Sequence, residues 1–268
     1  MTEQSVPGGA RGGFAVDEVA PGVHVTTAQT YTTTTTVVAG ADGGCLLIDP
    51  AVSVADLAAL AEWLAARGLR PVAGWSTHPH WDHLLWSPAL GDVPRYATPR
   101  AVAVAARELS QLINAVKEGA PGHDLRLFGR VEALGGHEID WPGPRAIVYS
   151  HDAHAPGHGA LFVPDAGVLI AGDMCSDIEI PLPDLQRPDP FGDYAEGLGL
   201  LAGIPGVGTL VPGHGHPGDG AEFRRRVAAD FAYLDAVAAG TDIPDGRLTE
   251  DWLRAEHARA LARARTAR

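Results

Sequence analysis

The sequence is short of several features that would assign a protein to a class at once. It has only two cysteines, Cys45 and Cys175, far apart and without a CxxC spacing, so neither a disulfide framework nor a thiolate zinc finger is indicated. No apolar run approaches the roughly 18 residues of a membrane span. The first residues also lack the basic and apolar regions of a secretory signal. We therefore expect a cytoplasmic protein that does not act in a membrane.

Basic patches and two common enzyme motifs are missing as well. The formal net charge is -13, and the basic residues do not gather into a stripe before the last twenty positions. Nucleic acid and anionic membranes are therefore poor candidate partners, and we expect a small-molecule substrate. No GxSxG supports a serine hydrolase, and no GxxxxGK[ST] supports a nucleotide site. The oligomeric state is not indicated by any pattern.

The composition is that of an ordinary globular chain. Of 268 residues, 46% are hydrophobic and 20% are charged, which is enough to bury a large core. No Ser/Pro/Gly-rich linker divides the middle of the chain. We expect a flexible Gly-rich lead-in at 1–13 and a single domain at 14–268, which includes C-terminal helices at about 219–240 and 248–266.

Short β-like runs alternate with helical ones. One helix pattern begins with Ser53 as N-cap and Asp56 three residues later, and it ends at Gly68. Strands followed by helices, twice over, predict two sheets packed face to face with helices outside. The expected strands are 23–27, 31–39, 44–50, 71–77, 130–134, 137–140, 144–150, 159–163, 168–172 and 209–212, and the other expected helix is 99–117.

Histidines and aspartates gather where these strands end. "THPHWDH" (77–83) follows an apolar run, and "HDAHAPGH" (151–158), "GD" (172–173) and "PGHGH" (212–216) each follow another predicted strand. Grouping such side chains costs desolvation and repulsion unless something draws them together. Loops that leave buried strands can converge at one edge of a sandwich. Imidazoles with carboxylates are the ligands expected for two divalent ions, with Zn2+ first and Fe or Mn as alternatives.

These motifs, in this order, resemble the metallo-β-lactamase-fold hydrolase superfamily. The HxHxDH signature is followed by a histidine before "APG", then by "AGD" and "PGHG", and the resemblance runs from "VAGADGGCLLIDP" to the helix after "VPGHG". Four separated motifs are far more specific than any one of them. The resemblance implies an α/β fold, a four-layer αββα sandwich with a dinuclear metal site at one edge of the two sheets.

The resemblance also implies a role for each ligand. His78, His80 and His154 would bind the first ion, and Asp82, His83 and His214 the second, with Asp173 bridging both. Asp82 is also the catalytic candidate, because it could accept or pass on a proton. The candidates for supporting the ligands or contacting substrate are Asp49, which resembles the family's buttressing aspartate, together with His158, His216, Tyr194 and Trp81.

The charge of such a site predicts hydrolysis. Two divalent ions carry four positive charges and the two aspartates cancel two, so the site favours a bound hydroxide at neutral pH. The predicted mouth segments (84–98, 117–128 and 176–193) hold few cations. Their apolar side chains suggest a partly apolar substrate. These side chains are Trp86, Ile178, Ile180, Leu182 and Phe191, together with Trp81 just before the first segment.

We therefore expect a metal-dependent hydrolase that uses a metal-bound hydroxide to cleave an ester, lactone or thioester. The alternative is a mononuclear iron enzyme resembling sulfur dioxygenases, which use a subset of these ligands. A β-lactamase is less favoured because Asp173 stands at the bridging position. A phosphodiesterase acting on nucleic acid is less favoured because of the acidic charge.

Overall fold

Two β-sheets form the centre of the protein. The computed structural model describes residues 14–266, so the predicted lead-in at 1–13 lies outside the described residues, as do residues 267 and 268. The first sheet has the order β1-β2-β3-β4-β5-β6-β7 and the second β12-β11-β10-β9-β8. The strands of the first sheet are β1 (Asp17–Ala20), β2 (Val23–Thr27), β3 (Thr34–Ala39), β4 (Gly44–Ile48), β5 (Arg70–Trp75), β6 (Arg95–Ala97) and β7 (Glu132–Ala133).

The two sheets mix antiparallel and parallel pairs. In the first sheet the pairs from β1 to β4 are antiparallel, and those from β4 to β7 are parallel. In the second sheet, within the described residues, β10 and β11 form the one parallel pair and the other neighbouring strands are antiparallel. Its strands are β8 (Ile147–His151), β9 (His158–Val163), β10 (Val168–Gly172), β11 (Thr209–Pro212) and β12 (Gly218–Asp219).

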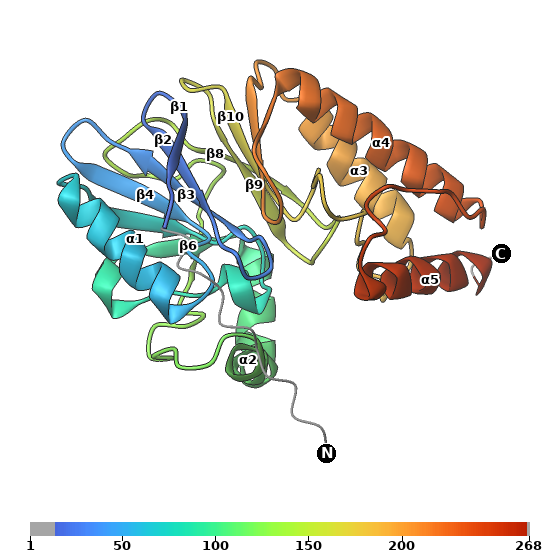
Figure 1. Ribbon diagram of the computed structural model, residues 1–268, viewed down its shortest axis with the longest axis horizontal. Helices are drawn as coiled ribbons and strands as arrows, with labels where there is room; N and C mark the ends of the chain where they lie inside the picture. The colour runs from blue at the N-terminus through green and yellow to red at the C-terminus, as the bar shows by residue number, and fades with distance from the viewer. Residues whose placement is uncertain (1–13, 267–268) are drawn as a thin grey trace.

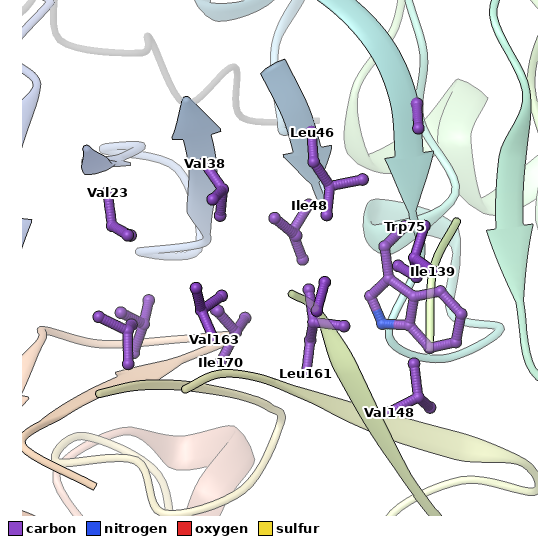
Figure 2. Close-up of a cluster of buried hydrophobic side chains, with 14 of the residues drawn as sticks. Val23, Val38, Leu46, Ile48, Trp75, Ile139, Val148, Leu161, Val163 and Ile170 are labelled. Carbon is purple, nitrogen blue, oxygen red and sulfur yellow. The ribbon is translucent and has the colours of Figure 1, made fainter. Parts of the chain in front are cut away.

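The main core lies between the facing sheets. Val38, Leu46 and Ile48 of the first sheet face Leu161 and Ile170 of the second, all at most 2% exposed (Figure 2). Apolar side chains at alternate positions of each strand supply this layer, because successive side chains of a strand point to opposite faces.

Helices cover the outer faces and complete the sandwich (Figure 1). Leu57, Leu60 and Leu64 pack one helix onto the first sheet, and two helices pack onto the second. The last helix packs on the helix that precedes it in the chain. The predicted four-layer αββα architecture is therefore confirmed. The helices are α1 (Val54–Ala66), α2 (Pro99–Gly119), α3 (Pro190–Ala202), α4 (Gly220–Ala238) and α5 (Asp251–Thr266), with short 3-10 turns η1 (Trp81–His83) and η2 (Pro88–Leu90).

The start of α1 was readable from sequence. The Ser53 hydroxyl accepts the Asp56 amide at 3.1 Å, and the Asp56 carboxylate accepts the Ser53 amide at 3.1 Å. This reciprocal capping box satisfies two amide groups that a helix start leaves unpaired. Gly68, just past the end of α1, takes a φ of 65°, which suits glycine.

Two sequence expectations were wrong in detail, and one helix was missed. Residues 137–140 form no strand and make only an isolated bridge from Glu138 to Ile147, because Gly-Gly before them and Pro-Gly-Pro after them leave no room for a ladder. The strand expected from residue 31 begins at Thr34, since Tyr31 and Thr32 have positive φ. Helix α3 was not predicted because glycines at 192, 197 and 199 mask its apolar face, although Asp189 caps it and Pro190 opens it.

The short strands β1 and β12 at the sheet edges were also missed. No helix within residues 14–266 is long and apolar enough to cross a bilayer.

Candidate metal centre

The strand ends that carry the polar motifs meet at one edge of the sandwich. Backbone hydrogen bonds tie them together: Gly159 donates to the Thr77 carbonyl at 2.7 Å, and Gly213 donates to the Gly172 carbonyl at 2.6 Å. Thr34 of β3 donates to the Gly213 carbonyl at 2.8 Å. Loops from both sheets are thus held on one rigid frame, which fixes the side chains that they carry.

Seven predicted ligands come together there in two groups. In the first, His80 Nδ1 lies 3.0 Å from His78 Nε2 and 3.1 Å from His154 Nε2. In the second, His214 Nε2 lies 3.2 Å from Asp82 Oδ2 and 3.3 Å from His83 Nε2. Within each group the candidate ligand atoms all lie within 4.8 Å of one another, and Asp173 counts with the first.

Asp173 stands between the groups. Its Oδ2 lies 3.3 Å from His78 Nε2 and 3.4 Å from Nε2 of both His154 and His214. Its Oδ1 lies 3.2 Å from His83 Nε2. One carboxylate therefore touches imidazoles of both groups, which is the arrangement that a bridging ligand requires.

Hydrogen bonds on the far side of three rings fix which nitrogen faces the cluster. His154 Nδ1 donates to the Leu182 carbonyl at 2.9 Å, and His214 Nδ1 donates to the Tyr31 carbonyl at 2.8 Å. His83 Nδ1 lies 2.9 Å from Asp49 Oδ2. A carbonyl and an ionised carboxylate only accept, so each Nδ1 carries a hydrogen and each Nε2 is the atom available to a cation.

Asp49 orients a second ligand candidate, His78, through Thr77. The Thr77 hydroxyl donates to Asp49 Oδ2 at 2.6 Å, and the Thr77 amide donates to Asp49 Oδ1 at 2.8 Å. Because the hydroxyl hydrogen is used in this way, Thr77 Oγ1 accepts from His78 Nδ1 at 3.0 Å. Asp49 thus has the contacts expected of a buttress for the ligand loop.

Burial and neighbouring carboxylates divide the imidazoles electrostatically. Burial lowers the pKa of His154 to about 3 and that of His78 well below its ordinary value. Burial acts in the same direction on His83 and His214, but the carboxylate of Asp173 and then that of Asp82 outweigh it and raise the pKa of both. The second group therefore needs positive charge beside it, which protons or a metal ion can supply.

The residues fit a pair of divalent cations. Ring nitrogens and carboxylate oxygens converge at 3.0–3.4 Å. Contacts this close between unprotonated acceptors are repulsive, so a cation or a proton must lie among them. Asp173 Oδ1 is buried and receives no hydrogen bond within residues 14–266. A nitrogen and oxygen ligand set suits zinc, and also iron or manganese.

The other candidates lie in different surroundings. Trp81 lines the cavity above the cluster. His158 is fully buried behind His78, with the rings stacked at 5.1 Å and 18°, and in the described chain neither of its ring nitrogens has a hydrogen-bond partner. Tyr194 belongs to α3 and its side chain is buried in the core. The side chain of His216 is 63% exposed and pairs with Asp177 at 2.9 Å. Neither Tyr194 nor His216 lines the cavity.

A cavity of about 1620 Å³ opens over the cluster. Helix α2, helix α5 and the loop after β10 form its walls, and His80, Asp82, His154, Asp173 and His214 are among the residues that line it.

The predicted mouth of this cavity was only partly right. Ile178, Leu182 and Trp81 line it, but Trp86 and Ile180 are 3% exposed and belong to two separate hydrophobic clusters. Phe191 packs against the cluster of Ile180 and against the cluster between α3, α4 and the second sheet. Sequence reasoning missed Tyr31 and Glu179, which also line it. No motif marks either residue.

Comparison with known proteins identifies the family. The family model described as "Metallo-beta-lactamase superfamily" matches residues 30–227, which include both groups of candidate ligands. The chain belongs to the metallo-β-lactamase superfamily. A search of curated proteins finds no match to this chain.

Solved structures of the same fold include a metallo-beta-lactamase family protein from Thermus thermophilus, with 22% identity, a TM-score of 0.64, and coverage of 92% of this chain and 93% of that one. A beta-lactamase domain protein from Burkholderia ambifaria has 22% identity and a TM-score of 0.64, covering 84% and 76%. A metallo-beta-lactamase from Pontibacter korlensis has 17% identity and a TM-score of 0.62, covering 83% and 99%. At these identities the likeness shows the fold of the superfamily and leaves the substrate open.

Proposed function

We propose that this protein is a dinuclear metal-dependent hydrolase that cleaves an ester, lactone or thioester of a partly apolar small molecule. The observation that carries the proposal is Asp173, whose two oxygens touch imidazoles of both ligand groups at the floor of the cavity. Two divalent ions, most simply zinc, would supply an acidified water at neutral pH and would polarise a carbonyl oxygen.

The chain's own residues would hold and orient the reacting groups. His78, His80 and His154 would bind one ion, and Asp82, His83 and His214 the other, with Asp173 shared between them. The list of these ligands is the one that the sequence motifs suggested.

Asp82 is the proposed proton acceptor. It is 7% exposed, it lines the cavity, and His83 and then His214 hold its pKa below the ordinary value against the effect of burial. A carboxylate kept ionised at this position can take a proton from the attacking water and pass it toward the leaving group.

The cavity suits an organic substrate with apolar parts. Val104 and Leu112 of α2 and Leu253 of α5 line it together with Leu182. Its volume of about 1620 Å³ exceeds the roughly 300–1,000 Å³ of a typical ligand site. The scissile group would therefore occupy the inner end, and the walls between α2 and α5 would contact the rest of the substrate.

Elemental analysis coupled to an activity panel tests the proposal. The purified protein is expected to hold two metal equivalents, and a chelator is expected to abolish turnover of at least one ester, lactone or thioester, with metal restoring it. Asp173→Ala is expected to lose that turnover and at least one metal equivalent.

Three results would overturn the proposal. They are full metal occupancy with unchanged turnover in Asp173→Ala, turnover of a phosphodiester alone, and a single iron with oxygen uptake. The last of these would support the dioxygenase alternative.

A further inference from the structure

Glu179 is held beside the candidate metal centre by the turn after β10. The Ser176 hydroxyl accepts the amides of Ile178 and Glu179 at 3.1 Å each, and it donates to the His214 carbonyl at 2.7 Å. The same hydroxyl therefore fixes the backbone of Glu179 and that of a metal-ligand candidate. The half-buried Glu179 side chain lines the cavity.

The carboxylate of Glu179 has no partner of its own. Within residues 14–266 no group donates a hydrogen bond to it and no cationic side chain pairs with it. Burial raises the pKa of Glu179 to about 7, His214 opposes this shift, and the carboxylates of Asp173 and Asp82 add to it. Such a carboxylate gains free energy from a donor or cation brought by a ligand.

The charged side chains around the cavity leave negative charge in excess. Its two arginines are already used, since Arg107 pairs with Glu108 at 2.6 Å and Arg259 pairs with Glu256 at 2.7 Å. Four further lining carboxylates have no ion-pair partner in the described part of the chain: Glu118, Glu179, Asp184 and Glu250. Apart from the metal ions, an anionic substrate would find no free cation there, whereas a cationic one would be attracted.

Two aromatic rings in the same cavity suit a cation too. The rings of Tyr31 and Trp81 meet edge to face at 5.7 Å and 82°. Trp81 lies over Gly119 in the last turn of α2, where an added Cβ would come within 2.8 Å of the ring. The C-terminus of a helix carries partial negative charge, and the face of an aromatic ring attracts ammonium groups.

We propose that Glu179 is a specificity-determining residue that selects substrates carrying a positively charged nitrogen, either a protonated amine or a quaternary ammonium group. The inference rests on the proposed function, because it names the substrate class for the same site. Glu179 supplies the counter-charge, and the aromatic pair supplies apolar surface for the alkyl groups around the nitrogen.

Binding of matched probes tests the inference without requiring turnover. Choline and its uncharged analogue 3,3-dimethylbutanol have similar shapes, so their relative affinity for the metal-loaded protein, measured by calorimetry, isolates the charge. We expect choline to bind about tenfold more tightly and Glu179→Gln to remove that preference with unchanged metal content and unchanged melting temperature. Glu250→Gln, which removes the same charge from the exposed rim of the cavity, is the matched control and is expected to keep most of the preference.

The outcomes separate this inference from the proposed function. No preference for choline in the wild-type protein, or equal losses in both variants, would overturn the role of Glu179. Loss of metal in Glu179→Gln would also overturn it, by assigning the residue to the ion site. The same protein is also assayed with an ester of choline and the matching ester of 3,3-dimethylbutanol. If the preference for choline is present and depends on Glu179, but neither these two esters nor any other compound of the panel is hydrolysed, the proposed hydrolase function fails and the specificity assignment stands.

Discussion

Replacing Asp49 with asparagine is expected to move one hydrogen on the ring of His83, in the candidate metal centre, without changing the backbone. Asp49 has a φ of 47°, a left-handed conformation that asparagine adopts readily. Its carboxylate accepts from the Thr77 amide, the Thr77 hydroxyl and His83 Nδ1 at 2.8, 2.6 and 2.9 Å. An amide has one oxygen and one NH2 group, so it cannot accept from all three donors.

The consequence falls on the ligand atom of His83. If the amide oxygen keeps the Thr77 amide, the NH2 group faces His83 Nδ1, which must then give up its hydrogen and become an acceptor. The neutral ring would then carry its proton on Nε2, the atom that faces Asp173 at 3.2 Å and His214 at 3.3 Å. Loss of such an orienting partner typically lowers metal affinity about 10- to 100-fold, which is about 1.4–2.8 kcal/mol.

Competitive chelator titration with zinc or cobalt measures this effect. We expect one of the two ions to bind about 10- to 100-fold more weakly to Asp49→Asn, while the other is little affected and the far-UV circular dichroism is unchanged. Asp165→Asn, the same change at an exposed turn residue, is the control and should leave both affinities as they are. Wild-type affinity for both ions in a folded Asp49→Asn protein would refute the tautomer argument.

Three other predictions follow from single contacts. Carboxylates raise the pKa of His83 and His214 above the ordinary value of 6.5, so both rings carry an extra proton in the ion-free protein at pH 7. Metal binding should therefore release protons, and the metal affinity should increase as the pH rises toward the raised pKa values. Calorimetry in buffers of different ionisation enthalpy measures this release, and finding none would contradict the prediction. Gly172→Ala places a Cβ against a buried ring at a φ of 56°, and we expect a loss of at least about 1 kcal/mol in the free energy of unfolding, which an unchanged urea midpoint would contradict. The carboxylate of Asp230 is 1% exposed and lies 2.5 Å from the guanidinium of Arg247, so Arg247→Met leaves it buried without its partner. We expect urea denaturation at pH 7 to show a loss of about 3–5 kcal/mol in the free energy of unfolding. A loss of no more than a few tenths of a kcal/mol would mean that solvent already screens the pair.

The meeting of the candidate ligand motifs at one place was predictable because it depends on local structure. A histidine or aspartate that follows a buried strand within a few residues stays near the end of that strand, and the carboxyl ends of β5, β10 and β11 lie at one edge of the sandwich. The reciprocal cap formed by Ser53 and Asp56 was predictable for the same reason, since both residues belong to one turn.

The walls of the cavity were much less predictable. Trp86 and Ile180 were expected at the mouth and are instead buried in hydrophobic clusters, because the spacing of apolar residues does not say which partner will cover them. Glu179 carries no motif, and its place beside the cluster depends on the hydrogen bond between Ser176 and His214, 38 residues apart in sequence.

By itself, then, the sequence determined the kinds of candidate ligand atoms, their order along the chain and the start of α1, all of which depend on neighbours within a few residues. Only the tertiary structure decided which nitrogen of each imidazole faces the cluster and which charges surround the cavity. Those properties arise between residues such as His83 and Asp49, or Tyr31 and His214, which the packing of two sheets brings together across long stretches of chain.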